Sequence, residues 1–319
     1  MLLKDHEPLP IHAGRMPHPL VTSDHVSRLR SGVYVFDAAW SGLFVEDRLR
    51  VRASAVWASL KNTQCTITHI TAAALHGLPL FRLNADRVDV ALPAGATRSN
   101  GGDIRRHHVP LPHADIATVD GMRVTSLERT VYDVIRSVSL EAAVVVFDAA
   151  LHKVAWDDKT NTYDEPEAER FRQAVRERVC THPGARGIRQ ARFVTEFADG
   201  RAGSPGESVS RLWMWELGVP TPELQYRVEL RNGRYALLDF AWPHLCKWGE
   251  FDGQIKYSDA GILRGRTVDE IMQLQQEREA AVEAATKWKC ERWGSPALTD
   301  LPDFARAMRA AGLLPGRVT

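Results

Sequence analysis

The sequence predicts an α+β protein in which a helix-rich N-terminal mixed domain is followed by a mixed β-sheet flanked by helices. Helical periodicity dominates the first part of the chain, with short β-branched runs between the helical segments. The stretch FADGRAGSPG at 197–206 is typical of a linker, and after it the expected order of elements is α-β-β-β-α-β-α. The expected divisions are an irregular arm at 1–25, a first domain at 26–200 and a second domain at 201–319.

The composition is that of an ordinary globular protein and does not by itself indicate a partner. The 319 residues are 44% hydrophobic and 25% charged, and the formal net charge is +1. Such a charge does not indicate nucleic-acid binding, although a local basic groove would suffice for it. The four cysteines form no CxxC pair, which argues against a thiolate zinc site and favours reduced thiols. With no signal peptide and no membrane-spanning apolar run, the expected location is the cytoplasm, with no membrane partner.

The elements of the first domain follow from periodicity and turn signals. RLRSGVYVF predicts a β-ribbon around its Ser-Gly turn, and Leu49, Ala53, Val56 and Leu60 have the spacing of a helix over 45–60. The remaining expected elements are a strand in RVDVALP, a loop at 94–102, a helix after Ser126, a helix in SLEAAVVVFDAALHKV, and helices at about 166–180 and 185–198.

The second domain is expected to begin with a helix over 204–217. Ser204 suits its N-cap, Pro205 its first turn and Gly218 its C-terminal stop. The alternation in ELQYRVEL predicts a strand, and the Asn-Gly pair in ELRNGRY predicts a hairpin turn after it. The remaining expected elements are strands in RYALLDFAW and CKWGEFD, a helix at about 267–286, a strand in KWKCERW and a helix near 302–311.

Three acids, Asp239, Glu250 and Asp252, lie among hydrophobic residues in LLDFAWPHLCKWGEFDGQIKY. If His244 and Leu245 form a two-residue turn, Asp239 lies directly opposite Glu250, with Cβ atoms only about 4.5–5.5 Å apart. Like charges there repel, and a divalent cation, Mg²⁺ or Mn²⁺, would stabilise the pair. The three acids are therefore candidate metal ligands. The alternative is a solvated face of the sheet, against which the flanking aromatic residues argue.

Two further residues are candidates for the same site. Glu207 follows Ser204 at the spacing of a capping box, so it is interpreted as a helix cap, as a third metal ligand, or as both. Lys256 follows shortly after Glu250 and could steady a phosphate or the attacking water. The alternative for Lys256 is a solvated lysine at the end of a strand.

The segments SPGES, LGVPTPELQYRV, LLDFAWP, GEFDGQIKY and QEREAAVE make residues 204–300 resemble the actinobacterial proteins related to very-short-patch repair endonucleases, in the PD-(D/E)XK superfamily. The run EFDGQIKY is the most specific of these segments. The resemblance implies a restriction-endonuclease-like fold and a Mg²⁺-dependent DNA endonuclease. In it, Asp239 would be the central metal ligand, Glu250 the second carboxylate and Glu207 the helix acid. Two residues after Glu250, where the superfamily usually has lysine, this chain has Asp252.

The first domain carries a second resemblance. RSGVYV, THITAAALHGLPL and VTSLERTVYDVIRSVSLEAAVVVFDAAL are similar to segments of AbiEi-family antitoxin-like proteins. In many of those a winged helix-turn-helix that binds promoter DNA comes first, whereas here only about 25 irregular residues precede RSGVYV. Arg28 and Arg30 are candidates for phosphate contacts beside the ribbon turn, and a second basic cluster is formed by Arg105, Arg106, His107 and His108, of which the two arginines are candidates for phosphate contacts. The alternative for the second cluster is an exposed strand or loop.

The leading functional hypothesis is hydrolysis of DNA phosphodiester bonds by Glu207, Asp239, Glu250 and Lys256 with Mg²⁺. The alternative is a non-catalytic DNA-binding antitoxin or transcriptional regulator whose second domain keeps a degenerate nuclease fold. A third hypothesis is a protein-interaction module of a defence system. The expected partners are DNA and a cognate toxin or defence-system protein.

Overall fold

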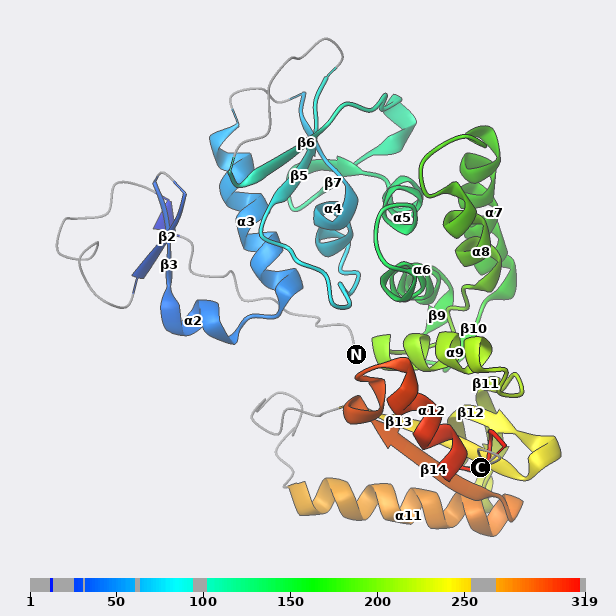
Figure 1. The fold of residues 1–319 in the computed structure, drawn as a ribbon. Coiled ribbons are helices and arrows are strands. Elements are labelled where there is room, and N and C mark those ends of the chain that lie inside the picture. The colour runs from blue at the N-terminus through cyan, green and yellow to red at the C-terminus, as the bar shows by residue number, and fades with distance from the viewer. Residues whose placement is uncertain are drawn as a thin grey trace. The chain divides into compact units, whose positions relative to one another are not determined.

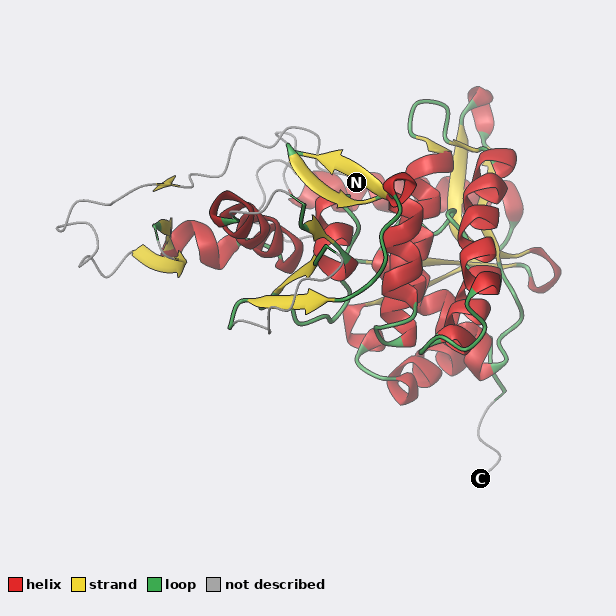
Figure 2. Cartoon of the chain, turned by 90° about the horizontal axis from the view of Figure 1, so that it is seen from above, coloured by secondary structure: helices red, strands yellow, loops and turns green. Residues whose placement is uncertain are grey.

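A computed structural model divides the protein into two compact units, Met1–Gly200 and Arg201–Thr319. Both units contain helices and β-sheets (Figure 1), and helices outweigh strands along the chain (Figure 2), so the predicted α+β class is confirmed. None of the helices within the described ranges is long and apolar enough to cross a membrane. The residues that the structure describes are 12–13, 26–30, 32–60, 64–93, 102–253 and 268–315.

The first unit opens with a small antiparallel sheet in the order β1-β3-β2. β2 (Val26–Arg30) and β3 (Val33–Phe36) are antiparallel neighbours, and β1 (His12–Ala13) pairs with β3. Gly32 in the turn has a φ of +78°, a left-handed conformation that glycine adopts without strain. The ribbon predicted from the Ser-Gly turn is therefore confirmed.

A five-stranded mixed sheet follows, in the order β6-β5-β4-β8-β7. Its β4–β8 and β5–β6 pairs are parallel, whereas its β4–β5 and β7–β8 pairs are antiparallel. Its elements are β4 (Thr66–Ile67), β5 (Val88–Ala91), β6 (Ile104–His107), the 3-10 helix η1 (His113–Asp115), β7 (Ile116–Val119) and β8 (Met122–Thr125). The strand predicted in RVDVALP is β5, and it is buried throughout. The predicted loop at 94–102 lies almost entirely outside the described residues.

Helices outweigh strands in the first unit (Figure 1). They are α2 (Asp37–Gly42), α3 (Val45–Ser59), α4 (His69–Leu75), α5 (Leu127–Ile135), α6 (Leu140–Ala155), α7 (Glu165–Thr181) and α8 (Ile188–Phe197). Most of α6 is buried, because its sequence is largely alanine and valine. Ser126 caps α5 as predicted, since its Oγ accepts a hydrogen bond from the N–H of Arg129 at 3.3 Å. A short hairpin of β9 (Trp156–Asp157) and β10 (Thr162–Tyr163) joins α6 to α7.

The second unit is built on a four-stranded mixed sheet in the order β11-β12-β13-β14. β11, β12 and β13 are antiparallel neighbours, and β14 pairs in parallel with β13. Its elements are α9 (Pro205–Leu217), β11 (Glu223–Glu229), η2 (Arg231–Gly233), β12 (Tyr235–Trp242), η3 (Pro243–Leu245), β13 (Lys247–Asp252), α11 (Val268–Thr286), β14 (Lys289–Gly294), η4 (Ser295–Leu298) and α12 (Leu301–Ala310). The predicted order of helices and strands is therefore confirmed.

Different helices cover the two faces of this sheet (Figure 1). α11 covers one face, and the apolar cluster there contains Val228, Ala236, Leu238, Trp248 and Val282. α9 and α12 cover the other face, on which Trp293 of β14 donates from Nε1 to Ser210 Oγ at 2.8 Å and packs edge-on against Phe304. The β12–β13 hairpin is thus held between two helical layers.

The hairpin between β12 and β13 differs from the prediction at its turn. Instead of a two-residue turn at His244 and Leu245, a 3-10 turn that begins at Pro243 is followed by Cys246 with a φ of +53°. Proline fixes its φ near the value of a 3-10 turn, and the N–H of Cys246 donates to the carbonyl of Pro243 at 3.1 Å, so both residues belong to the turn and not to the strands. The predicted register is nevertheless confirmed by the pairs Phe240↔Gly249, Ala241↔Trp248 and Trp242↔Lys247.

Candidate functional site

Asp239 lies on β12 where the backbone pairing of the sheet is interrupted on both sides. In the register of β12 and β13 it is opposite Glu250, as predicted, but the backbone pairs stop at Phe240. On the other side, Gln225 of β11 has a φ of +48° and is skipped by the pairing. The N–H of Phe251 instead donates to Oδ2 of Asp239 at 3.2 Å. The carboxylate therefore replaces a backbone acceptor of the sheet.

Glu207 approaches the same hairpin from the first turn of α9. Its N–H donates to Ser204 Oγ at 3.2 Å, as the predicted cap requires, but its Oε2 accepts from the N–H of Gly203 at 2.8 Å. In a capping box the donor of this second bond would be the N–H of Ser204, so here the donor lies one residue earlier. Gly206 allows α9 to lie close to β13, because a Cβ there would overlap the ring of Phe251. Glu207 is buried, with 9% of its surface exposed.

Three acids, Glu207, Asp239 and Glu250, act on one another at this position. Burial raises the pKa of Asp239 to about 8, and the charges of Glu207 and Glu250 add to the effect. The hydrogen bond from Phe251 and the charge of Arg278 act in the opposite direction and are weaker. At neutral pH, Asp239 therefore holds a proton unless a cation comes near it.

Glu250 is compensated by two arginines from outside the hairpin. Arg278 of α11 contacts Oε1 of Glu250 and also donates to the carbonyl of Leu237. Nη2 of Arg292, on β14, lies 2.9 Å from Oε2. Both oxygens of Glu250 face positive charge, so Asp239 is the acid of the group whose ionised form is least compensated.

Asp252 has different surroundings from the other two predicted metal ligands. Its Oδ1 accepts from Nη1 of Arg292 at 3.0 Å and from Nε2 of Gln275 at 3.1 Å, and its side chain is 48% exposed. The structure thus brings Asp239 and Glu250 together, whereas Asp252 is tied to groups on α11 and β14. The predicted Lys256 lies outside the described residues.

The group of Glu207, Asp239 and Glu250 supplies only part of what a metal site requires. Among the residues that the structure describes, no three His, Cys, Asp or Glu side chains are arranged to hold a metal ion. Glu207 and Asp239 nevertheless offer only oxygen donors, which are the donors that Mg²⁺ and Mn²⁺ take. A cation beside them would relieve the repulsion that raises the pKa of Asp239. Glu250 is the part that fits least, because two arginines already occupy both of its oxygens.

The arginines predicted to contact phosphates have contacts within the first unit. Nη1 of Arg30 lies 2.6 Å from Oδ2 of Asp103, and Nη1 of Arg105 lies 3.5 Å from a buried aspartate of β5. Arg106 is half-buried, and Arg28 is exposed with its Nε donating to the carbonyl of Arg30 at 3.2 Å. The ion pairs of Arg30 and Arg105 leave less of their charge for a phosphate.

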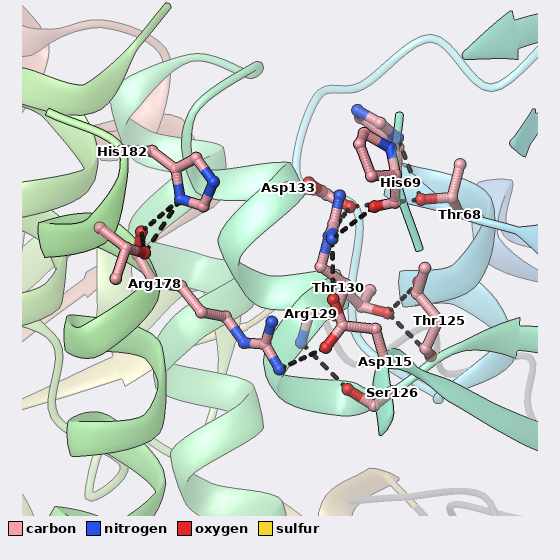
Figure 3. Close-up of polar contacts among 12 residues, drawn as sticks. Thr68, His69, Asp115, Thr125, Ser126, Arg129, Thr130, Asp133, Arg178 and His182 are labelled. Carbon is pink, nitrogen blue, oxygen red and sulfur yellow. Dashed lines mark hydrogen bonds and ion pairs between the residues drawn. The ribbon is translucent and has the colours of Figure 1, made fainter. Parts of the chain in front are cut away.

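A buried charge network, which the sequence did not single out, surrounds α5 in the first unit (Figure 3). Arg129 donates from Nε to Asp133 Oδ2 at 2.9 Å and from Nη1 to Asp115 Oδ2 at 2.8 Å. Arg178 of α7 lies 2.6 Å from Oδ1 of Asp115, and Arg136 lies 3.4 Å from Oδ1 of Asp133. Each of the four carboxylate oxygens therefore faces an arginine nitrogen. We refer to these five residues as the arginine–aspartate network.

The arginine–aspartate network favours the ionised form of Asp115 inside the protein. Asp115 and Asp133 are 3% and 0% exposed. Burial alone would raise the pKa of Asp115, but hydrogen bonds from Arg178 and Arg129 outweigh it and lower the pKa overall. The matched charges join α5, α7 and the segment before β7, which is a structural role.

Two stacked histidines lie beside the network. The rings of His69 and His107 are 3.8 Å apart between centroids, and Nε2 of His107 lies 2.7 Å from Oδ1 of the buried Asp89. Burial lowers the pKa of His69 to about 4, and the charge of Asp133 opposes this only in part. His69 is therefore neutral at physiological pH and acts as a packed ring.

Some of these residues had a signal in the sequence and others had none. Arg129 and Asp133 are one helical turn apart in LERTVYD, the spacing of an ion pair on a helix. Asp115 and Arg178 come from distant segments. Arg278 and Arg292 likewise meet Glu250 only through the packing of α11 and the pairing of β13 with β14.

Comparison with known proteins finds two relatives, and neither is described with an activity. No protein-family model matches the chain. The chain is similar to two Mycobacterium tuberculosis proteins, "Uncharacterized protein MT2308" of strain CDC 1551 / Oshkosh and "Uncharacterized protein Rv2248" of strain ATCC 25618 / H37Rv. It is 31% identical to each over 198 residues, which are 62% of this chain and 66% of the relative. The chain therefore spans just under two thirds of the length of these relatives.

Proposed function

We propose that the second unit hydrolyses phosphodiester bonds of DNA with the help of a divalent metal ion. The observation that carries the proposal is Asp239, a buried acid whose pKa is raised to about 8 by burial and by two neighbouring acids. Acids perturbed in this way cluster at catalytic sites, although structural networks can perturb them too. The resemblance of residues 204–300 to very-short-patch repair endonucleases supports the same assignment.

The residues suit a metal-dependent mechanism as follows. Mg²⁺ or Mn²⁺, when bound, would supply a polarised phosphate and an activated water. Asp239 would release its proton to the solvent and become a ligand, and Glu207 would face the ion while it still accepts from the N–H of Gly203. Arg278 and Arg292 would hold Glu250 in a fixed orientation beside Asp239. Lys256 would offset developing charge.

A second candidate function is a non-catalytic DNA-binding antitoxin or regulator. The observation that favours it is the occupation of both Glu250 oxygens by arginines, together with Asp252 at the position where the superfamily usually has lysine. In this case the acids would be the remnant of a lost site. Under either function the partners would be DNA and a cognate toxin or defence-system protein, and the location the cytoplasm.

The experiment that separates the two functions is a cleavage assay on supercoiled plasmid and on mismatched duplex. Purified full-length protein is incubated with Mg²⁺, with Mn²⁺ or with chelator. Asp239→Asn and Glu207→Gln remove one carboxylate each from the acid group. Glu229→Gln removes one from an exposed position on β11 of the same sheet, where the acid pairs with Arg227, and is the matched control.

If the second unit is a nuclease, nicking requires the metal and falls at least about a hundredfold in Asp239→Asn, as expected for loss of a group that stabilises the transition state. Glu229→Gln keeps its activity. Absence of cleavage with either metal, together with salt-sensitive DNA binding, would overturn the nuclease proposal and favour the regulator. Cleavage that persists in Asp239→Asn would also overturn it, because the acid group could not then be the site.

A further inference from the structure

The segment 178–195 runs from the end of α7 through most of α8 and has an excess of positive charge. It contains four arginines and no aspartate or glutamate. Arg178 is directed inward to Asp115 and is compensated there. Arg186, Arg189 and Arg192 are exposed, and within the described part of the chain none of these three side chains is paired with an acidic group. We refer to these three residues as the α8 arginines.

The backbone that carries the α8 arginines is firmly held on the first unit. Nη1 of Arg136 donates to the carbonyl of Arg186 at 3.2 Å. Nε2 of Gln190 donates to the carbonyls of Ile135 at 2.8 Å and Val138 at 3.0 Å. The turn before α8 therefore docks on the C-terminal end of α5, and its side chains are presented from a fixed backbone.

Gly187 shows how close this docking is. Its φ is +75°, in the region that favours glycine, and a Cβ there would overlap the carbonyl group of Arg136. No other residue fits at this position without a shift of the backbone. The arrangement thus limits the conformational freedom that binding would otherwise have to remove.

Arg189 and Arg192 form one electropositive face of α8, and Arg186 lies in the turn just before this helix. Arg189 and Arg192 are three residues apart on α8, so their side chains lie on the same side of the helix. The next residue on that side, Glu196, is bound by Arg176 at 2.8 Å and 3.0 Å and contributes little free negative charge. The first turn of α8 carries no acid, so the positive end of the helix dipole adds to the potential.

We propose that the α8 arginines bind the phosphate backbone of duplex DNA. Guanidinium groups bind phosphate through paired hydrogen bonds, and unpaired exposed arginines on a rigid scaffold suit a regular array of phosphates. Contacts of this kind position a protein on DNA and carry no sequence information. The choice of DNA as the polyanion rests on the function proposed for the second unit.

The test compares two triple variants of the full-length chain. Arg186→Gln/Arg189→Gln/Arg192→Gln removes the α8 arginines. Arg170→Gln/Arg227→Gln/Arg306→Gln removes the same charge from exposed arginines that are paired with Glu167, Glu229 and Asp303. Binding of a fluorescent random-sequence duplex is followed by anisotropy over a range of salt concentrations, with chelator present so that no cleavage occurs.

The α8 triple variant is expected to lose at least about tenfold in affinity, and the slope of log K against log salt falls by about 2.7, or 0.9 for each lost phosphate contact. The control triple variant keeps the slope of the wild-type protein. Equal losses in both triple variants would overturn the proposal, since net charge alone would then explain them. No binding of duplex by the wild-type protein would overturn it as well, as would α8-dependent binding to phosphatidylserine vesicles but not to duplex.

A cleavage assay on the same variants separates this proposal from the nuclease proposal. If no metal supports cleavage but the α8 triple variant still loses salt-dependent binding, the nuclease proposal is wrong and the DNA surface stands. If cleavage occurs and the α8 triple variant has an unchanged KM for DNA, the surface is wrong and the nuclease proposal stands.

Discussion

The two units bury acids in opposite ways. In the arginine–aspartate network of the first unit, all four oxygens of Asp115 and Asp133 face arginine nitrogens. In the second unit the compensation stops at Glu250, and Asp239 receives one backbone N–H and the repulsion of two acids. Burial acts on both groups, but the pKa of Asp115 is lowered and that of Asp239 is raised to about 8.

This difference distinguishes buried acids whose ion pairs stabilise the fold from buried acids that lower the stability of the fold. Removing one partner of a matched buried ion pair is strongly destabilising, whereas a buried acid crowded by other acids is destabilising as it stands. Residues at functional sites commonly carry such a cost. The comparison therefore predicts opposite signs for substitutions in the two groups.

The largest effect is expected at Arg129. Arg129→Ala leaves Asp115 and Asp133 buried with one arginine each, and the first unit should lose about 3–5 kcal/mol of unfolding free energy. Denaturant unfolding, with hydrogen exchange of α5 and α6 peptides to localise the change, measures it. Arg129→Lys keeps the charge but cannot bridge both acids, so an intermediate loss of unfolding free energy is expected. This variant replaces Arg129→Ala in the test if Arg129→Ala does not fold.

The control for this prediction is an ion pair on the surface. Arg170 pairs with Glu167 on α7 and is 65% exposed. Arg170→Ala should change the stability by less than about 0.5 kcal/mol. Equal effects of Arg129→Ala and Arg170→Ala would mean that the arginine–aspartate network does not stabilise the first unit.

The next effect has the opposite sign. Asp239→Asn imitates the protonated acid without the need to bind a proton, so the second unit should gain about 2–3 kcal/mol at pH 7, less than the full pKa shift implies at about 1.4 kcal/mol per unit. Thermal unfolding of the metal-free protein measures the gain. A loss of stability in Asp239→Asn would show that the carboxylate is structural, and the contrast between the units would disappear.

The same residue sets a dependence on pH. The folded pKa of Asp239 is about 8, above the ordinary value of 3.8 in the unfolded chain, so the folded state binds more protons between these values. Stability of the second unit therefore falls as pH rises from about 4 to about 8 and then levels off, with a slope of at most about 1.4 kcal/mol per pH unit. Asp239→Asn should remove this slope.

Local signals in the sequence predicted the scaffold of the site well. Ser204 and Gly218 predicted both ends of α9, and the predicted register places Asp239 opposite Glu250. These features depend on neighbours in the chain: a side-chain cap, a left-handed glycine and a period of two. The predicted turn was too short, because Pro243 begins a 3-10 turn that continues to the left-handed Cys246.

The electrostatics of the site could not be predicted in the same way. Arg278 and Arg292 come from α11 and β14, and no pattern within LLDFAWPHLCKWGEFDGQIKY indicates them. The break in β11–β12 pairing at Gln225 depends on a left-handed backbone conformation, which the regular alternation of ELQYRVEL does not indicate. Contacts between distant segments thus decide which of the acids is compensated, and the sequence alone showed three similar candidates.

The smallest expected effect tests whether packing crowds the acids. Gly206→Ala adds a Cβ that would overlap the ring of Phe251, so α9 must move away from β13 and carry Glu207 with it. The overlap should lower the unfolding free energy by about 1–3 kcal/mol, and the better helix propensity of alanine should raise it by about 1 kcal/mol. A net loss of about 1 kcal/mol is therefore expected. As Glu207 moves away, the pKa of Asp239 should shift toward its ordinary value.

The control is Gly42→Ala on α2, where a Cβ meets nothing within 4 Å and the propensity gain alone is expected. If Gly206→Ala is as stabilising as Gly42→Ala, α9 can relax without strain and packing does not hold Glu207 in place. If Gly206→Ala destabilises while the pH-dependent loss of stability becomes smaller, the close approach of α9 to β13 is what crowds the acids. The part of the raised pKa of Asp239 that is due to Glu207 would then follow from the packing of a glycine against an aromatic ring.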